Sequence, residues 1–184
     1  MGSAGGCREV SCAAASLALV KVTRSAAYAL DPDGILEIIS DTEFQEEKCR
    51  ATFAIDYQAS VQTRAGHTVV TTQRSMPMEH IPEVARGFMG NRLVIHETQE
   101  WSGPNAAGLY TADLKVHIEG APITGRGRRL LQPADAGGTH DQIQIVIKAS
   151  IPLIGRKIEE AAGPPVGAAA EIETELLAAR ASGG

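Results

Sequence analysis

Apolar and polar residues alternate with a period of two along much of the chain, a pattern typical of strands with one buried face. The alternation is cleanest where Tyr110 and Leu114 point one way and Asp113 and Lys115 the other. Turn residues such as those at 65–66 separate neighbouring strands by hairpin-length connections. The strands predicted in this way are residues 17–28, 55–62, 68–75, 91–101, 108–119, 123–132 and 139–150.

Two short helices are predicted between the first and second strands. Asp31 has the side chain of an N-cap, and Pro32 follows at the first helical position. The second helix, over residues 41–49, is highly charged and is capped by either Asp41 or Thr42.

A further helix is predicted between the third and fourth strands. Its apolar residues share one helical face, Pro82 lies in its first turn and Gly90 follows its end. The flanking methionines are adaptable apolar side chains, which suit a mobile entrance or a contact surface. We interpret the segment as a lid candidate, and the alternative is a helix that only covers the end of the sheet. The lid candidates are Ile81, Val84, Phe88 and Met89.

The last thirty residues predict a long amphipathic helix over 151–181 that closes the sheet. Pro164-Pro165 interrupts the pattern, yet the apolar stripe keeps its phase, which favours a kinked helix over two separate helices. Alanine and proline hold four of the seven stripe positions, so the helix offers little bulk to fill a concave sheet. We therefore expect a cavity beneath it. The stripe is Ile158, Ala162, Pro165, Ala169, Ile172, Leu176 and Ala179, while Glu171, Glu173 and Arg180 are expected in solvent.

The order β-α-α-β6-α predicts an α+β fold with helices packed against an antiparallel sheet of about seven strands. Three short segments resemble the START-like (SRPBCC) superfamily, whose helix-grip members include polyketide cyclases and lipid-transfer domains. These are Glu97-Thr-Gln-Glu-Trp101, Gly120-Ala-Pro-Ile-Thr-Gly125 and Ile151-Pro-Leu-Ile-Gly-Arg-Lys-Ile-Glu159. More narrowly, residues 17–180 resemble an uncharacterised bacterial family of unknown function within it. The resemblance implies a curved sheet around the C-terminal helix, with a hydrophobic cavity between them, and it implies no reaction.

Length and composition point to one domain. Residues 16–181 are expected to form it, and the Gly-, Ala- and Ser-rich residues 1–15 to be a disordered extension. The 17 basic and 22 acidic side chains include no long basic run, so no nucleic-acid partner is expected. We interpret Arg126, Arg128 and Arg129 as a solvated strand face. No stretch is long and apolar enough for a membrane span.

The candidate chemistry is sparse. The three cysteines lack zinc-site spacing and fit reduced thiols in a cytoplasm, and the five histidines are scattered singly. No cofactor or metal is therefore expected. Glu97 shares a strand face with apolar residues, where a carboxylate would need a partner or a raised pKa, so it is a weak catalytic candidate. A one-residue β-bulge would instead put it in water.

The predicted ligand-binding residues are the inward-facing ones, and the alternative is that they simply pack on one another. They are Tyr57, Val61, Leu93, Ile95, Glu97, Trp101, Tyr110, Leu114, Val116, Ile143, Ile145, Ile147, Ile158, Ala162, Ile172 and Leu176.

The function that these patterns favour is binding or transport of a small hydrophobic ligand, such as a lipid, polyketide or quinone-like compound, by a cytoplasmic protein. The first alternative is a cyclase- or aromatase-type enzyme in which Glu97 or a tyrosine moves a proton. The second is a protein-interaction module that uses the methionine-rich helix, so a protein partner is left open.

Overall fold

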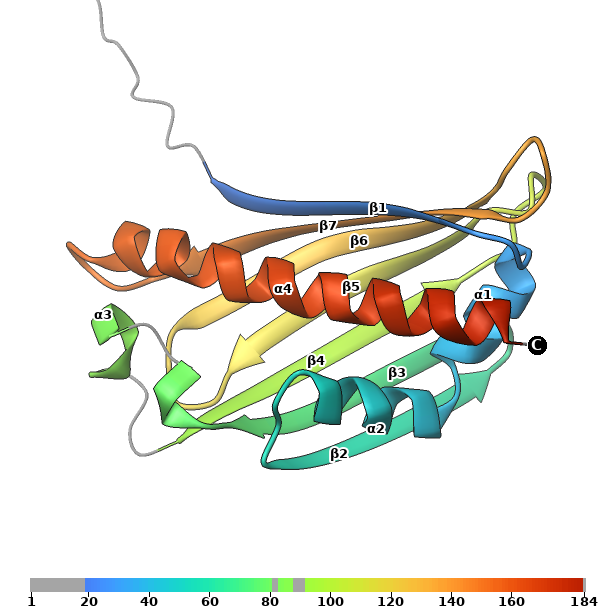
Figure 1. Ribbon diagram of the computed structural model, residues 1–184. Helices are drawn as coiled ribbons and strands as arrows, with labels where there is room; N and C mark the ends of the chain where they lie inside the picture. Colours follow the sequence, from blue (N-terminus) through green and yellow to red (C-terminus); the bar gives the residue numbers. More distant parts are fainter. Residues whose placement is uncertain (1–18, 81–82, 88–91, 184) are drawn as a thin grey trace, which may run out of the picture.

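A single seven-stranded sheet forms the framework of the protein (Figure 1). The computed structural model describes residues 19–80, 83–87 and 92–183. All neighbouring strands are antiparallel, in the order β1-β7-β6-β5-β4-β3-β2. The strands are β1 (Val20–Tyr28), β2 (Asp56–Arg64), β3 (His67–Met76), β4 (Leu93–Ser102), β5 (Tyr110–Ile118), β6 (Ile123–Pro133) and β7 (Thr139–Ala149). The helices are α1 (Pro32–Ile39), α2 (Thr42–Ala51), α3 (Glu83–Arg86) and α4 (Gly155–Ser182), with a 3-10 turn at Met78–His80.

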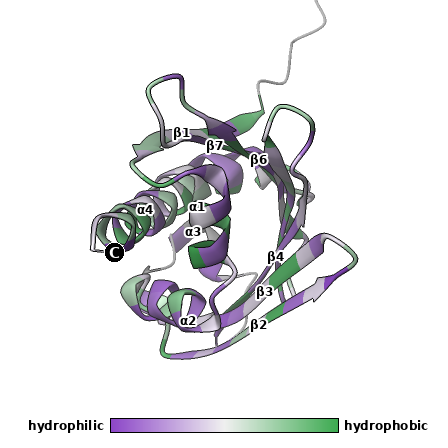
Figure 2. Ribbon diagram, turned by 90° about the vertical axis from the view of Figure 1, so that its right-hand side faces the viewer, coloured by the Kyte–Doolittle hydropathy of each residue, from purple (hydrophilic) through white to green (hydrophobic). Residues whose placement is uncertain are grey.

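The sheet curves around the helices, as the view along α4 makes plain (Figure 2). Helix α4 lies across the concave side of β1 and β7, α1 packs beside the C-terminal end of α4, and α2 lies over β2 and β3 at the other edge of the sheet. Gly127 of β6 contributes to the close approach of strands here, because a Cβ at this position would lie 1.9 Å from the backbone oxygen of Gln144 on β7. The predicted α+β helix-grip arrangement is confirmed.

The short helices begin where their capping residues predict. The Asp31 carboxylate accepts a hydrogen bond from the Gly34 amide at 2.8 Å, and Pro32 opens α1. Asp41, not Thr42, caps α2, with its carboxylate 3.0 Å from the Glu43 amide nitrogen. Both caps satisfy amides that have no partner within their helix.

Helix α4 is one helix of 28 residues that runs through Pro164 and Pro165 without a break. Its buried face departs from the predicted stripe towards the C-terminus: Leu177 is fully buried, Leu176 only partly, and Ala179 is exposed. The prediction for Ala179 is therefore wrong. Steps of 4 and 3 average 3.5 residues, and a straight helix drifts by about 20° per heptad against that repeat, so the stripe falls behind the buried face over three heptads.

The packed interior consists of two apolar clusters. The larger lies under α1 and the C-terminal end of α4, and includes Ile35, Trp101, Leu131 and Leu177. The smaller joins Ile123, Ala149 and Ile158 at the other end of the sheet.

Most of the lid candidate cannot be placed in the structure. Ile81, Phe88 and Met89 lie outside the described residues, and so does the side chain of Val84.

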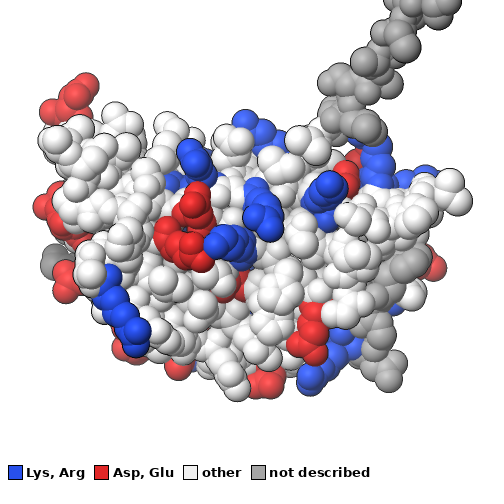
Figure 3. Space-filling model, turned by 180° about the vertical axis from the view of Figure 1, so that it is seen from behind, with Lys and Arg blue, Asp and Glu red and all other residues white. Residues whose placement is uncertain are grey.

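The outer face of the sheet carries charges of both signs (Figure 3). Arg128 pairs there with Asp113 at 3.5 Å, and Lys115 with Glu100 at 2.6 Å. Arg129, in contrast, is only 1% exposed and points into the concave side. The prediction that it shares a solvated face with its neighbours is wrong, because strand alternation turns it the other way.

Candidate ligand cavity

A cavity of about 400 Å³ lies between the concave face of β3–β7 and helices α2 and α4. Its wall is mainly apolar, and α4 lines it with several small side chains. Apolar cavities of this size are typical of sites for small molecules. The strands contribute Met76, Leu93, Ile95, Leu114, Val116, Ile118, Ile123, Ile143 and Ile145 to the wall, and α4 contributes Ile158, Ala162, Pro165, Val166, Ala168, Ala169, Ala170 and Ile172. The remaining lining residues are Lys48, Thr52, Phe53, Arg74, Glu97, Gln99, Arg129 and Glu173.

Ten of the sixteen predicted ligand-binding residues line this cavity. They are Leu93, Ile95, Glu97, Leu114, Val116, Ile143, Ile145, Ile158, Ala162 and Ile172. The other six lie outside the lining, which corrects their predicted place on the wall: Tyr57, Val61, Trp101, Tyr110, Ile147 and Leu176.

Packing accounts for most of these six positions. Trp101 and Tyr110 belong to the larger apolar cluster, and Val61 and Leu176 pack against it. Tyr57 lies on the edge strand β2, where its hydroxyl accepts a hydrogen bond from Arg50 at 2.7 Å. The Tyr110 hydroxyl donates to Asp33, a partner on α1.

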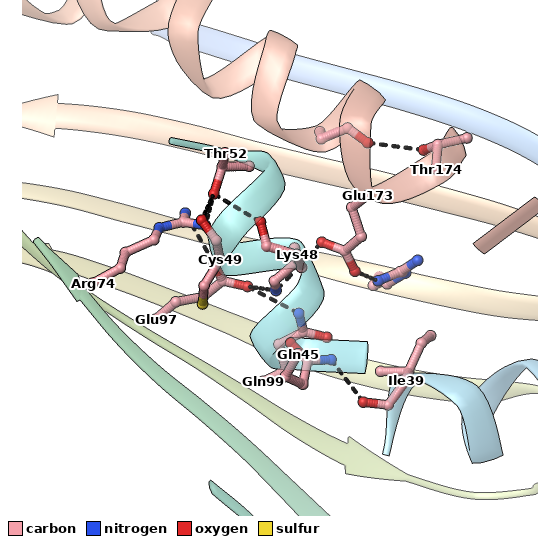
Figure 4. A network of polar contacts seen from close by, with 12 residues as sticks. Ile39, Gln45, Lys48, Cys49, Thr52, Arg74, Glu97, Gln99, Glu173 and Thr174 are labelled. Atoms are coloured by element: carbon pink, nitrogen blue, oxygen red, sulfur yellow. Dashed lines mark hydrogen bonds and ion pairs between the residues drawn. The ribbon is translucent and has the colours of Figure 1, made fainter. Parts of the chain in front are cut away.

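Glu97 points into the concave side and is held by three donors (Figure 4). Its Oε1 accepts hydrogen bonds from Lys48 Nζ and Gln99 Nε2, both at 2.9 Å. Its Oε2 accepts from an Arg74 guanidinium nitrogen at 3.3 Å. Strand β4 pairs with β3 and β5 in unbroken register through this residue, so the alternative of a bulge that puts Glu97 in water is wrong.

A second group of charges lies beside the first. Arg129 binds Asp141 through two nitrogens, at 3.0 and 2.6 Å, and donates to Glu173 from a third. Lys48 Nζ lies 3.5 Å from Glu173 Oε2 and so links this group to Glu97. We call the linked residues the inner polar cluster: Lys48, Arg74, Glu97, Gln99, Arg129, Asp141 and Glu173.

The inner polar cluster is balanced, with three cations and three carboxylates. Burial raises the pKa of Glu97, but Lys48 and Arg74 outweigh this effect and hold that pKa well below its ordinary value. Burial likewise raises the pKa of Glu173, and Lys48 and Arg129 bring it below the ordinary value. Burial lowers the pKa of Lys48, yet the two glutamates raise it overall. All three groups are therefore charged near neutral pH.

Six members of this cluster were not among the predicted site residues: Lys48, Arg74, Gln99, Arg129, Asp141 and Glu173. Two of them have a local signal, since Arg129 follows Ile123 at even spacing on β6, and Glu173 lies four residues before the buried Leu177. The prediction that Glu173 faces solvent is wrong, because burial places it with Ala170 and Leu177 on one helix face.

The lowered pKa values predict acid sensitivity. A carboxylate whose pKa is depressed in the folded state stabilises the protein above its ordinary value of 4.5, and that stabilisation is lost as pH falls towards the folded pKa. We expect the free energy of unfolding, measured by urea titration, to fall below about pH 4.5. Glu97→Gln should make this fall shallower, and Glu171→Gln, on an exposed residue, should leave it unchanged. Equal slopes for Glu97→Gln and the parent protein would contradict the assignment.

Two histidines predicted to be scattered singly are in fact neighbours. His96 and His117 stack on the outer face with ring centroids 4.3 Å apart, and His96 Nε2 lies 3.2 Å from Glu119.

Across the described ranges, no three His, Cys, Asp or Glu side chains are arranged to hold a metal ion. Cys49 is buried with a free thiol. Among helices of the described chain, none has the length and apolar character needed to cross a membrane.

Solved structures of very different sequence share this fold. The Zhui aromatase/cyclase from Streptomyces sp. R1128 superposes with a TM-score of 0.58 at 12% identity, covering 88% of this chain and 93% of that one. The lipid transfer and protein localization domain of human StarD13 gives a TM-score of 0.53 at 11% identity, covering 85% and 74%. A START superfamily protein from Mycobacterium smegmatis gives 0.52 at 14%, covering 88% and 97%.

Sequence comparison leads to uncharacterized proteins. Those from Mycobacterium tuberculosis and Mycobacterium bovis are 28% identical over 109 residues, which is 59% of this chain. The match spans 62% of the length of these curated relatives. The sequence profile of the family described as "Protein of unknown function (DUF2505)" matches residues 23–180. The chain thus belongs to the DUF2505 family and has the helix-grip fold of the START superfamily.

Proposed function

We propose that the protein binds a small apolar molecule in the cavity beneath α4. The observation that carries this proposal is the cavity of about 400 Å³ with an apolar wall and one charged end. Transfer of an apolar molecule from water into such a space is favourable because apolar surface is removed from water, by roughly 25 cal/mol per Å².

The apolar wall and the polar end of the cavity contribute differently to ligand recognition. The apolar part includes Leu93, Ile118 and Ile158. It favours binding of any hydrophobic group of suitable shape. The polar end includes Arg74 and Glu97, which would hold a polar group of the ligand and so fix the orientation of the ligand. Relatives in fold include an aromatase/cyclase and a lipid-transfer domain, which supports a ligand of lipid or polyketide size.

Binding is favoured over proton transfer at Glu97. A general acid or base needs a pKa near the working pH, whereas Lys48 and Arg74 keep the pKa of Glu97 low. Both of its oxygens are already engaged by donors. We therefore treat the carboxylate as part of a fixed charge network. A cytoplasmic site of action remains our expectation from the cysteine content.

Native mass spectrometry of the protein purified from its own organism tests the proposal. We expect a lipid-sized adduct to remain bound under gentle ionisation and to be lost on denaturation. The emptied protein should then take up the neutral fluorescent probe N-phenyl-1-naphthylamine with enhanced emission. A bare mass together with no probe uptake would contradict a binding function, and a copurified polypeptide in place of the adduct would favour a protein-interaction module.

A further inference from the structure

The charged end of the cavity has more hydrogen-bond donors than acceptors. Arg74 is 8% exposed and lines the cavity. One terminal nitrogen donates to Thr52 at 3.3 Å and the other to Glu97 at 3.3 Å, while its Nε is buried without a hydrogen-bond partner. A buried donor without a hydrogen-bond partner costs free energy, so a ligand that supplies an acceptor here would bind more tightly.

Lys48 adds to this surplus. It is 2% exposed, and its Nζ donates a hydrogen bond to Glu97 at 2.9 Å and lies 3.5 Å from Glu173 Oε2. An ammonium group has three donors and a guanidinium five, so Lys48 and Arg74 together hold about eight N–H groups. On the acceptor side, Glu97 already receives two bonds at Oε1 and one at Oε2. The carboxylate of Glu97 cannot satisfy the remaining donors.

The charges that face the cavity do not balance. Lys48 and Arg74 pair with Glu97, and Lys48 also lies 3.5 Å from Glu173. Arg129 pairs with Asp141 and Glu173. Within the inner polar cluster, Asp141 is the charged residue that is not part of the cavity lining, which leaves three cations and two carboxylates on the wall. The charged end of the cavity therefore has an excess of positive charge, and a ligand anion placed there would be paired.

From this arrangement we propose that the ligand is an apolar carboxylic acid, bound as the carboxylate against Arg74 and Lys48 with its apolar body along the wall. The inference rests on the proposed binding function and names its ligand class. A carboxylate has only acceptors, and charge-assisted hydrogen bonds to guanidinium and ammonium groups are about twice as strong as neutral ones. An alcohol would leave donors unused. An amine would bring a further cation beside two existing ones.

Three compounds with one twelve-carbon tail separate these cases: dodecanoate, dodecanol and dodecylamine. Each would be titrated at neutral pH against protein loaded with N-phenyl-1-naphthylamine. We expect dodecanoate to displace the probe at about tenfold lower concentration than dodecanol, the equivalent of one charge-assisted hydrogen bond, and dodecylamine to be the weakest. If dodecanol displaces the probe as well as dodecanoate does, the carboxylate inference is wrong while binding stands. If the probe itself does not bind, the proposed function fails.

A matched pair of variants localises the effect. Arg74→Gln should remove the advantage of dodecanoate over dodecanol, whereas Arg126→Gln, on the exposed outer face of the same sheet, should keep it. An unchanged preference in Arg74→Gln would overturn the assignment. Should Arg74→Gln fail to fold, dodecanoate labelled with ¹³C at the carboxyl carbon gives a second test on the parent protein. The bound acid should stay ionised at a lower pH than the free acid, and an equal or higher bound pKa would refute the pairing.

Discussion

Replacing Arg129 by methionine is expected to lower the free energy of unfolding by about 3–5 kcal/mol. The guanidinium is 1% exposed and makes hydrogen bonds to Asp141 and Glu173, both of which are buried. Its removal leaves two carboxylates inside the protein with Lys48 as their nearest remaining cation, at 3.5 Å from Glu173. Urea denaturation followed by circular dichroism measures the loss, which corresponds to roughly 6–20 °C in melting temperature for a chain of this size.

The neighbouring Arg128→Met is the control. Arg128 lies one residue away on the same strand, but its side chain is 79% exposed and pairs with Asp113 on the outer face at 3.5 Å. Exposed pairs of this kind contribute about 0–1 kcal/mol. If both substitutions cost the same, the buried network would not hold the concave side together, and the carboxylates would have found water or other partners.

The fold was predictable because its signals are local. Alternation at period two located the strands, and the side chains of Asp31 and Asp41 marked the helix starts that the structure has. Hairpin-length connections then leave few choices of strand order, because consecutive antiparallel strands usually pair. The pairing of β1 with β7 was not predicted, because residues more than a hundred positions apart meet there.

The inner polar cluster was not predictable in the same way. Its members are charged, and a charged residue on a strand or helix is normally assigned to solvent unless a partner is known. The partners are distant in sequence: Lys48 meets Glu97 and Glu173, and Arg129 meets Glu173. Only the assembled fold brings them together. Strand alternation alone would have placed Arg129 on the inner side, but its charge led us to assign it to solvent with Arg126 and Arg128.

Only part of the cavity wall was predicted, and the reason is related. Alternation tells which face of a strand a residue is on, and it placed Tyr110 and Leu114 on the same face of β5. It does not tell how far along the sheet a helix covers that face. Tyr110 lies under α1, in contact with Asp33, whereas Leu114 lies further along where the wall is open to the cavity.

Ala169→Phe is expected to weaken uptake of N-phenyl-1-naphthylamine by at least about tenfold while the protein stays folded. Ala169 lines the cavity from α4, so an added phenyl ring would occupy space that a ligand needs. In a packed interior such an enlargement costs typically 1–3 kcal/mol through strain, but an existing space accepts the ring without it. Fluorescence titration measures the affinity, and thermal unfolding measures the stability of the same sample.

Ala178→Phe is the matched control, because Ala178 is exposed on the same helix and the substitution carries the same helix-propensity cost of less than about 1 kcal/mol. It should bind the probe as the parent protein does. Two outcomes would contradict the proposal that the ligand binds beneath α4. Unfolding of Ala169→Phe alone would mean that the space beneath α4 is already filled by side chains in solution. Unchanged probe affinity in a folded Ala169→Phe protein would mean that the probe binds elsewhere, and the cavity would then have no part in ligand recognition.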